Sequence, residues 1–543
     1  MEQLVQQLRL SARSLARARG FFVSAVLVLA IAIGATAAVF GLVDAVLLRP
    51  LPFRDADRLL VVWEKNAARH RMRNPAGPSN LLAWRERSLS FASLEALYIG
   101  IMPTLGGGEP ERVRATRVTP GLLPSLGVAP VLGRQLRPEE GLPGRGRVAV
   151  LSHELFVRRF GGDPAAVGGS IELDGVKHEI AGVLPAGFRL FAPADVLVPL
   201  TLDPADRTWQ GRSIVVIGRL APGATQERAQ GEMTAIAARL ATEYPEGDTG
   251  WTVNLVSLKE QLTGELRPAL LVLFGAVGLV LLIACTNVAN LVLARTAARR
   301  HELGVRLALG ASGGRLFTQL AAESVLVALA GGAAGLFLAR LALDVASAAA
   351  PRVAPSFALS ARLSPRVVLV ALASALAAAL VTSLAAVLAA REKDVVRLLK
   401  RGTASPAHAR TRSALVVGEM ALSVVLLVGA GLLTRSVLHL LAVDPGFEPE
   451  RAVTLTLTLP RVRYDNDEKR AAFLNAALER AAALPGVVAA GTVSTLPLDG
   501  LGSATTFTVR GAPPPAPGQK PVADVRAASG AYFAAMGIPL VAG

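Results

Sequence analysis

Long apolar stretches alternate along the chain with stretches of ordinary polarity, and five of the apolar stretches are long enough to cross a membrane. A helix needs about 20 apolar residues to span the hydrocarbon core, and a charge at its centre costs roughly 2.5 to 3.5 kcal/mol. In their central parts the five stretches contain only two charged side chains, Glu323 in the third and Glu419 in the fifth. We therefore predict membrane-spanning helices at 20–48, 267–294, 316–345, 366–390 and 413–434.

Basic residues beside these stretches predict their orientation, because short loops rich in arginine and lysine stay in the cytoplasm. Arginine is concentrated before the first span, after the second and after the fourth, whereas the loop between the third and fourth carries only Arg352 and Arg362. A cleaved signal peptide is the weaker alternative, since the apolar character continues to Leu48. The expected segments are a cytoplasmic N-terminus at 1–19, an outside domain at 49–266, a cytoplasmic loop at 295–315, a short outside loop at 346–365, a cytoplasmic linker at 391–412 and a second, incomplete outside domain at 435–543.

The first outside segment is large enough to fold around its own core, and its local patterns predict an α+β domain. We expect a strand at 58–64 and a helix capped by Ser79 that carries Leu82, Trp84 and Leu94. Asp174-Gly175 between two alternating runs predicts a hairpin. Further on, apolar residues at helical spacing over 229–244 lie between strands expected at 214–220 and 251–258, the pattern of a βαβ unit.

The composition fits a membrane protein, with 52% hydrophobic residues among 543. The net charge of +16 would suggest a nucleic-acid partner in a soluble protein, but aromatic residues are only 5% and the arginines adjoin the apolar runs, so we expect lipid contact and no nucleic acid. The single cysteine, Cys285, and the scattered histidines indicate no metal site. No glycine-rich stretch continues into the Gly-Lys-Ser/Thr of a nucleotide loop, and no catalytic constellation stands out.

The chain contains an internal repeat. Residues 120–128 (PGLLPSLGV) align without gaps with residues 530–538 (GAYFAAMGI). A basic stretch, an apolar span and an outside segment follow one another in residues 1–265 and again from residue 391. The repeat is therefore parallel, and we expect a strand at 453–459 and a helix after Asp465 or Asp467 in the second copy, which stops short of the full domain.

The loop after the second span carries a short amphipathic stretch in which Glu302 and Arg306 stand four residues apart and Gly310 is a plausible helix stop. The segment 302–311 (ELGVRLALGA), followed by 319–324 (QLAAES), resembles the signature of FtsX/MacB-type ABC transporter permeases. Residues 45–53 (AVLLRPLPF), 57–64 (DRLLVVWE) and 78–85 (PSNLLAWR) are similar to one subgroup, the acidobacterial duplicated orphan permeases.

This resemblance implies a bacterial inner-membrane protein with MacB-like periplasmic core domains, a permease without its own nucleotide-binding domain. It implies that the loop docks on a dimeric cytoplasmic ABC ATPase, which would bind ATP and magnesium while this chain binds no cofactor. Because Glu323 is a charge within a span, near its cytoplasmic end, we expect it to have a structural or coupling role. A periplasmic adaptor or outer-membrane channel is a further expected partner. The residues expected to couple to the ATPase are Arg299, Arg300, Glu302, Val305, Arg306, Leu309, Gly310 and Ala311.

Two functions stay open at this stage. The first is efflux or export driven by motion that passes from the ATPase to the periplasmic domains. The second is a membrane regulator that transmits force to a periplasmic partner, such as a cell-wall hydrolase, without transport. The spans lack the polar lining of an ion pathway, which agrees with both.

Overall fold

The computed structural model consists of two compact units, a helical unit within residues 1–50 and 263–442 and a second unit within residues 51–262 and 443–543. We call residues 51–262 the core domain and residues 443–541 the second segment. The structure describes residues 2–106, 111–203, 211–299, 313–353, 362–389, 406–457, 459, 464–498, 503–513 and 521–541.

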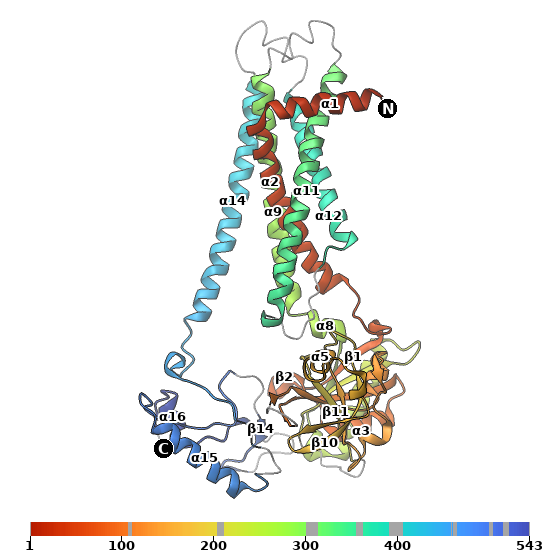
Figure 1. Ribbon diagram of the computed structural model, residues 1–543, viewed down its shortest axis with the longest axis vertical. Coiled ribbons are helices and arrows are strands. Elements are labelled where there is room, and N and C mark those ends of the chain that lie inside the picture. The colour runs from red at the N-terminus through yellow and green to blue at the C-terminus, as the bar shows by residue number, and fades with distance from the viewer. Residues whose placement is uncertain are drawn as a thin grey trace. The chain divides into compact units, whose positions relative to one another are not determined.

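The helical unit contains five described helices that are long and apolar enough to cross a membrane, which confirms the prediction of five spans. Helix α11 continues past residue 345 to Val353, and α14 begins at Pro406, within the predicted linker. Figure 1 shows the spans side by side and α1 lying across one end of them. The helices are α1 (Glu2–Arg17), α2 (Arg19–Val43), the π-helix η1 (Asp44–Leu48), α9 (Leu266–Ala298), α11 (Gly313–Val353), α12 (Pro365–Ala389) and α14 (Pro406–Leu441).

Helix α2 lies at the centre of this unit, in contact with α9, α11 and α12. It approaches α11 most closely where glycines face each other: a Cβ atom on Gly335 would lie 3.0 Å from the amide nitrogen of Gly34. A Cβ atom on Gly331 would lie 2.7 Å from that of Leu29. Small residues spaced four apart allow such backbone contact between membrane helices, where dispersion forces take over from hydrophobic burial. The α2–α11 contact is therefore a tightly packed seam.

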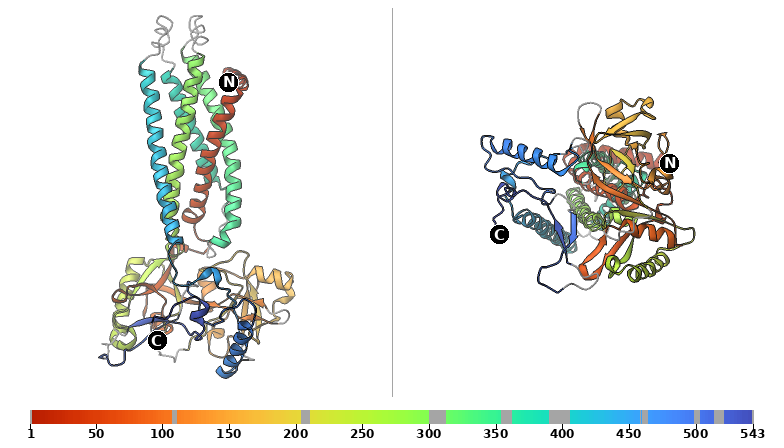
Figure 2. Two further views of the ribbon diagram at one scale, coloured as in Figure 1. Left: turned by 90° about the vertical axis from the view of Figure 1, so that its left-hand side faces the viewer. Right: turned by 90° about the horizontal axis from the view of Figure 1, so that it is seen from below.

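Helix α14 differs from the other spans in its surroundings. It contacts α9, beside which it lies in Figure 2, yet its apolar side chains are exposed along its length, among them Val417, Leu427 and Leu433. The helix is apolar enough to cross a membrane, so lipid can cover this surface.

The core domain is built on a mixed sheet of 13 described strands in the order β13-β1-β12-β3-β6-β11-β8-β10-β9-β4-β5, with β2 beside β1 and β7 beside β10. The strands are β1 (Leu59–Asn66), β2 (Arg71–Asn74), β3 (Phe91–Ile101), β4 (Thr104–Leu105), β5 (Glu111–Arg112), β6 (Ala115–Val118), β7 (Leu132–Gly133), β8 (Val148–Leu151), β9 (Ser170–Leu173), β10 (Val176–Val183), β11 (Val196–Pro199), β12 (Val215–Leu220) and β13 (Thr252–Ser257). The helices are α3 (Pro78–Arg87), α4 (Leu122–Leu126), α5 (His153–Phe160), α6 (Gln226–Glu243), α7 (Pro245–Asp248) and α8 (Leu258–Thr263).

The predicted βαβ unit is confirmed. Strands β12 and β13 both pair antiparallel with β1, one on each side, and α6 connects them. Because β1 is central, it is buried on both faces: Leu60 and Val62 pack in one cluster with Met233 and Leu240 of α6. The hairpin between β9 and β10 also forms at its predicted turn, with Asp174 and Gly175 at positive φ.

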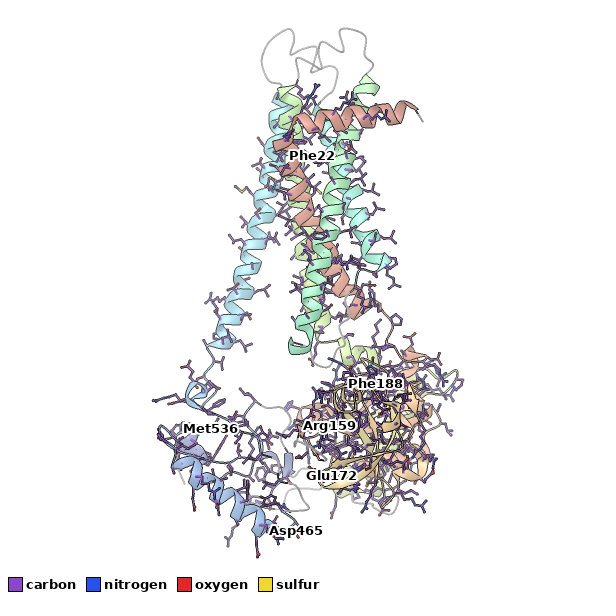
Figure 3. The ribbon with its side chains drawn as sticks, viewed as in Figure 1. Phe22, Arg159, Glu172, Phe188, Asp465 and Met536 are labelled. Carbon is purple, nitrogen blue, oxygen red and sulfur yellow. The ribbon has the colours of Figure 1, made fainter. Side chains whose placement is uncertain are left out.

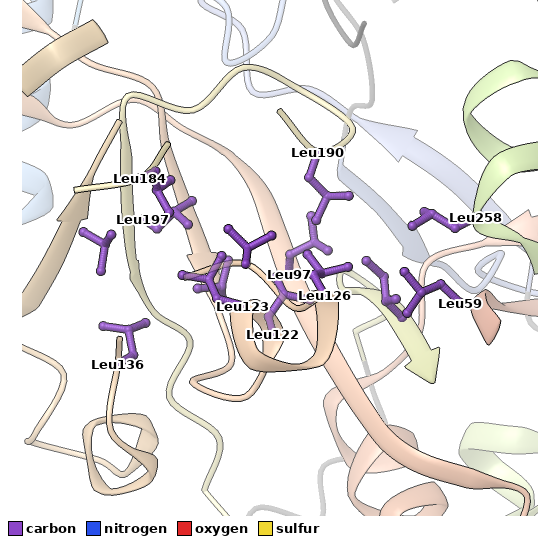
Figure 4. Packing of buried hydrophobic residues seen from close by; sticks show 14 of the residues in the cluster. Leu59, Leu97, Leu122, Leu123, Leu126, Leu136, Leu184, Leu190, Leu197 and Leu258 are labelled. Carbon is purple, nitrogen blue, oxygen red and sulfur yellow. The ribbon is translucent and has the colours of Figure 1, made fainter. Parts of the chain in front are cut away.

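The opposite face of β1 contributes to a second cluster, shown in Figure 4. Leu59 and Leu97 belong to it together with Leu122, Leu123 and Leu126 of α4. The short helix α4 ends at Gly127, whose φ of 73° is one that glycine adopts without strain. The repeat motif found in the sequence thus supplies three core leucines.

The strand expected at 58–64 is confirmed as β1, which begins at Leu59. Two other local predictions in the core domain are wrong. Helix α3 has Gly77 rather than Ser79 at its N-cap, because Pro78 takes the first helical position that proline favours. Leu94 lies in β3, since α3 ends at Arg87 and the chain becomes extended at Ser88.

The second segment contains η6 (Pro449–Arg451), α15 (Asp467–Ala482), β14 (Ser503–Thr506), β15 (Val522–Val525) and α16 (Tyr532–Ala535). The helix expected after Asp465 or Asp467 is α15, capped by the side chain of Asn466. The strand expected at 453–459 is wrong within the described residues: 452–457 and 459 form no strand.

Candidate coupling site

Most of the residues predicted to couple to an ATPase, Arg300 together with those from Glu302 to Ala311, lie outside the described part of the chain. Their neighbours on both sides are described. Arg299 directly follows Ala298, the last residue of α9, and Glu323 lies in the third turn of α11. We call this end of the helices, next to residues 300–312, the loop end, and the end joined to the core domain the domain end.

At the loop end the structure brings together Arg299 and Glu323, which the sequence marked separately. The Nη1 atom of Arg299 lies 3.5 Å from Oε1 of Glu323, and Nη1 of Arg295 lies 3.5 Å from its Oε2. Both arginines donate to Ser14 of α1, with distances of 3.1 Å to its Oγ, and Arg295 also stacks 4.6 Å from the ring of Phe21. These residues form the loop-end cluster, which ties α1, α2, α9 and α11 together. Phe22, labelled in Figure 3, marks this end of α2.

Burial gives the loop-end cluster its stiffness. The side chain of Glu323 is 9% exposed and that of Arg295 is 14% exposed. An ion pair in such surroundings gains little over an apolar contact, but removing one member costs about 3–5 kcal/mol because the other charge stays buried. The buried carboxylate of Glu323 therefore depends on Arg295 and Arg299 to balance its charge.

A second polar cluster lies at the domain end, where α2 continues into the π-helix η1. Asp44 accepts a hydrogen bond from Oγ of Ser364 at 2.9 Å and one from Nη1 of Arg366 at 3.1 Å. Nε of Arg49 lies 3.3 Å from the same carboxylate, whose side chain is 1% exposed. This domain-end cluster fixes the start of α12 to the last turn before the chain enters the core domain.

None of the four residues Asp44, Arg295, Ser14 and Ser364 was assigned a contact from the sequence. The partners are separated by about 280 to 320 residues, so no local spacing could have paired them. The one available signal was a charge at the edge of an apolar run, which is costly unless it is paired.

Between the two clusters the described spans offer few free polar groups. The hydroxyls of Thr36, Thr286 and Thr382 donate to the carbonyl four residues earlier in their own helices. Arg340 and Asp344 are more than half exposed and lie toward the domain end of α11. The packed interior of the helical unit therefore holds α2 in place and provides no charged pathway among the described residues.

The core domain has a polar cluster of its own, formed by Glu64, Asn80, Arg212 and Asp248. Arg212 bridges the two carboxylates through Nε to Glu64 and Nη2 to Asp248, the latter at 2.7 Å, and its guanidinium stacks 4.0 Å from the ring of Trp251. The Nδ2 atom of Asn80 lies 2.7 Å from Glu64 and 2.9 Å from Asp248. Burial raises the pKa of both carboxyls, against the opposing charge of Arg212.

Asp195, just before β11, shows the opposite balance. Burial acts to raise the pKa of this carboxyl, but hydrogen bonds from the side chain and amide of Arg114 hold the pKa below the ordinary value of 3.8. Arg158, 4.0 Å away, adds to the effect. Asp195 and the four-residue cluster thus join separate elements of the core domain through buried ion pairs.

Comparison with known proteins agrees with this architecture. The family model of the MacB-like periplasmic core domain matches residues 22–236, and that of the FtsX-like permease C-terminal domain matches residues 274–395. The fold and these two matches identify a membrane-integral permease whose core domain is of the extracytoplasmic type. The chain belongs to the FtsX/MacB-type permeases. Its assignment to the acidobacterial duplicated orphan subgroup stays a prediction.

Curated relatives match part of the chain. The macrolide export ATP-binding/permease protein MacB of Rhodospirillum rubrum is 31% identical over 197 residues, which cover 35% of this chain and 29% of that protein. MacB 1 of Aeromonas hydrophila is 28% identical over 202 residues, covering 35% and 30%. The ABC transporter permease YknZ of Bacillus subtilis is 26% identical over 208 residues, covering 38% and 50%. The chain thus spans less than a third of the length of these MacB proteins.

Solved structures are similar at a low level. The periplasmic region of MacB from Actinobacillus actinomycetemcomitans has a TM-score of 0.30 at 10% identity, covering 39% of this chain and 94% of that one. The extracellular domain of YknZ from Gram-positive bacteria has a TM-score of 0.27 at 13% identity, covering 36% and 99%.

Proposed function

We propose that this chain is the permease subunit of an ABC transporter that transmits the motion of a cytoplasmic ATPase dimer to extracytoplasmic domains for efflux or export. The observation that carries the proposal is the place of α2, the packed central helix with a buried charge cluster at each end. ATP and magnesium would bind at the ATPase. The protein would lie in the bacterial inner membrane with its N-terminus in the cytoplasm.

Transmission would begin at the loop after α9. Residues 299–311, and Glu302 above all, would dock on the ATPase, as the family resemblance implies. Arg299 is the described end of this segment, and its ion pair with Glu323 would pass a displacement to α11. The seam between α11 and α2 has no space for independent movement, since the backbones touch at Gly34 and Gly335.

At the other end, the domain-end cluster would deliver the displacement. Asp44 is held by three partners and lies six residues before Pro50, where the chain leaves the helical unit. The proposal therefore moves the core domain and needs no substrate path between the spans. The relatives named macrolide exporters support export as the purpose, and a periplasmic adaptor or outer-membrane channel would be the further partner.

A membrane regulator without transport is the second candidate. It would use the same path from loop to core domain, and the absence of a charged pathway among the described parts of the spans favours it equally. The two functions differ in what the core domain acts on, a transported compound or a periplasmic protein such as a cell-wall hydrolase.

The transmission proposal is tested in lipid nanodiscs that contain the full chain and a purified ABC ATPase subunit. Glu302→Lys should abolish the stimulation of ATP hydrolysis by the permease, because it reverses a charge at the expected docking surface. Asp44→Asn should keep the stimulation of ATP hydrolysis. It should abolish the ATP-dependent change in hydrogen exchange of residues 51–58, since it weakens the domain-end cluster, through which motion would reach the core domain.

Arg13→Glu, which reverses an exposed charge on α1, is the matched control and should behave like the unmodified protein. Stimulation of the ATPase that survives Glu302→Lys contradicts the docking role. A normal exchange response in Asp44→Asn contradicts the transmission path while leaving docking intact, so the two steps fail separately.

A further inference from the structure

Strand β13 is one edge of the core-domain sheet, because among the described strands it pairs with β1 alone. Its six residues (TVNLVS) carry no charge, and Val253 and Leu255 are each 4% exposed. Long, uncharged edge strands are the ones to which strands of other molecules add. The opposite edge, β5, has two residues, and Oε1 of Glu111 in it lies 2.7 Å from Nη2 of Arg158. A short, charged edge resists strand addition, so β13 is the edge that needs protection.

Helix α6 covers this edge with two glutamines. The Nε2 atom of Gln230 donates to the carbonyl of Val253 at 2.8 Å, and its Oε1 accepts from the amide of Leu255 at 2.8 Å. The Nε2 atom of Gln226 donates to the carbonyl of Leu255 at 3.1 Å. Three backbone groups on the outer side of β13 are therefore bonded to side chains of the same domain.

The side-chain amide of Gln230 takes the place of a neighbouring strand. In a parallel pair, a residue donates to the carbonyl that precedes the residue opposite to it and accepts from the amide that follows that residue. Gln230 makes these two bonds on either side of Asn254. Its Nε2 atom also donates to Oγ1 of Thr234 at 3.2 Å, so both of its N–H groups have acceptors. The orientation of the amide is thus fixed.

Packing of α6 on the sheet brings the glutamines to this edge. Ala229 and Met233 of α6 are fully buried, in the cluster that also contains Val253 and Leu255. The two glutamines stand four residues apart, so they lie on one side of the helix, next to this apolar stripe. Both are half-buried. The contacts that form the core therefore also place two amides against the backbone of β13.

We infer that Gln226 and Gln230 form an edge guard, a pair of side chains that closes the sheet at β13 and prevents a strand of another molecule from adding there. Backbone groups without a partner are costly, so removing the edge guard leaves β13 open to pairing with a second copy of this chain. The inference concerns association of the core domain and does not depend on the proposed function.

The test uses the full chain in lipid nanodiscs that each hold one copy, so that the spans of two molecules cannot meet. The double variant Gln226→Leu, Gln230→Leu removes the three bonds to β13 and keeps side chains of similar size. Sedimentation velocity measures association between discs, relative to the unmodified chain. Hydrogen exchange with mass spectrometry measures the amide of Leu255.

The expected result depends on protein concentration. In the unmodified chain the amide of Leu255 should exchange slowly at every concentration, because Gln230 holds it. In the double variant it should exchange at least about tenfold faster in dilute solution, since a free amide needs no opening step. At high concentration it should become slow again as the discs associate.

Two controls separate the edge guard from other effects. The amides of Asn254 and Val256 point toward β1 by the alternation of the strand, and they should stay slow in the double variant if β13 remains paired. Should they become fast, Gln230→Leu alone takes the place of the double variant. Ala238→Leu adds a leucine at an exposed position of the same helix and leaves both glutamines in place, so its discs should stay single.

Three results would overturn the inference. If the amide of Leu255 is equally slow in the double variant, the glutamines do not hold the edge. If this amide is fast but the discs stay single at every concentration, the open edge accepts no second copy. If Ala238→Leu associates as strongly as the double variant, an added apolar side chain causes the association.

Discussion

The seam between α2 and α11 gives the sharpest quantitative prediction for the helical unit. In Gly335→Val the new Cβ atom would meet the amide nitrogen of Gly34 at 3.0 Å, the carbonyl oxygen of Ala30 at 3.1 Å and the Cβ atom of Ile33 at 3.2 Å. The optimum between carbon atoms, as in the contact with Ile33, is about 3.5–4.0 Å. Two of these neighbours present backbone atoms, which cannot rotate away. The helices must therefore separate, and we expect a loss of about 2–3 kcal/mol, the upper part of the range for overpacked sites.

The assay is equilibrium unfolding of the full chain in mixed micelles, followed by the helical circular dichroism signal. Gly275→Val is the matched control: it makes the same substitution in a spanning helix, α9, where nothing lies within 4 Å of the new Cβ atom. We expect the control to unfold within about 0.5 kcal/mol of the unmodified chain. Equal stability of the two variants would refute the argument that backbone contact holds α2 against α11.

Two further predictions concern the core domain, which contains all four tryptophans of the chain, so that tryptophan fluorescence reports its unfolding. Arg212→Met should destabilise the core domain by about 3–5 kcal/mol, because it leaves two buried carboxylates without their cation. Adding Glu64→Gln should recover part of this loss. If Arg212→Met alone is as stable as the unmodified chain, Arg212 does not stabilise the domain by bridging the carboxylates. Asp195→Asn should have a lower free energy of unfolding than the unmodified chain at pH 7. This difference should shrink as the pH falls below 3.8, the ordinary pKa of an aspartate, because a carboxyl whose pKa is lowered by folding stops stabilising the folded state once it is protonated there. If the difference in free energy of unfolding is the same at pH 7 and pH 3, the charge of Asp195 does not contribute to stability.

The spans and the βαβ unit could be predicted because each depends on a local pattern. Twenty uncharged apolar residues allow few structures other than a membrane helix, and the spacing of Ala229, Met233 and Leu240 fixes one face of α6 whatever it packs on. The hairpin at Asp174-Gly175 is equally local, since these residues tolerate the positive φ that the turn requires.

The errors arose where distant residues decide the outcome. Leu94 fitted a helical spacing, but pairing with Gly218 of β12 places it in a strand. The alternation at 453–459 predicts a strand, yet a strand needs partners, and none of the described residues supplies them.

The clusters around Glu323 and Asp44 join residues from opposite parts of the chain. A single sequence carries no signal for such pairs beyond the presence of the charge itself.

The π-helix η1 has a mechanical consequence for the connection to the core domain. Its closing hydrogen bond runs from the amide of Arg49 to the carbonyl of Asp44, five residues back, so the last turn of α2 contains one residue more than an α-helical turn would hold. Rewinding that turn to regular α-helix would rotate the chain beyond it by roughly 100° and shift it by about 1.5 Å along the axis. If the proposed transmission holds, a push along α2 that broke the hydrogen bonds to Asp44 and rewound this turn would rotate the chain at Pro50 as well as shift it.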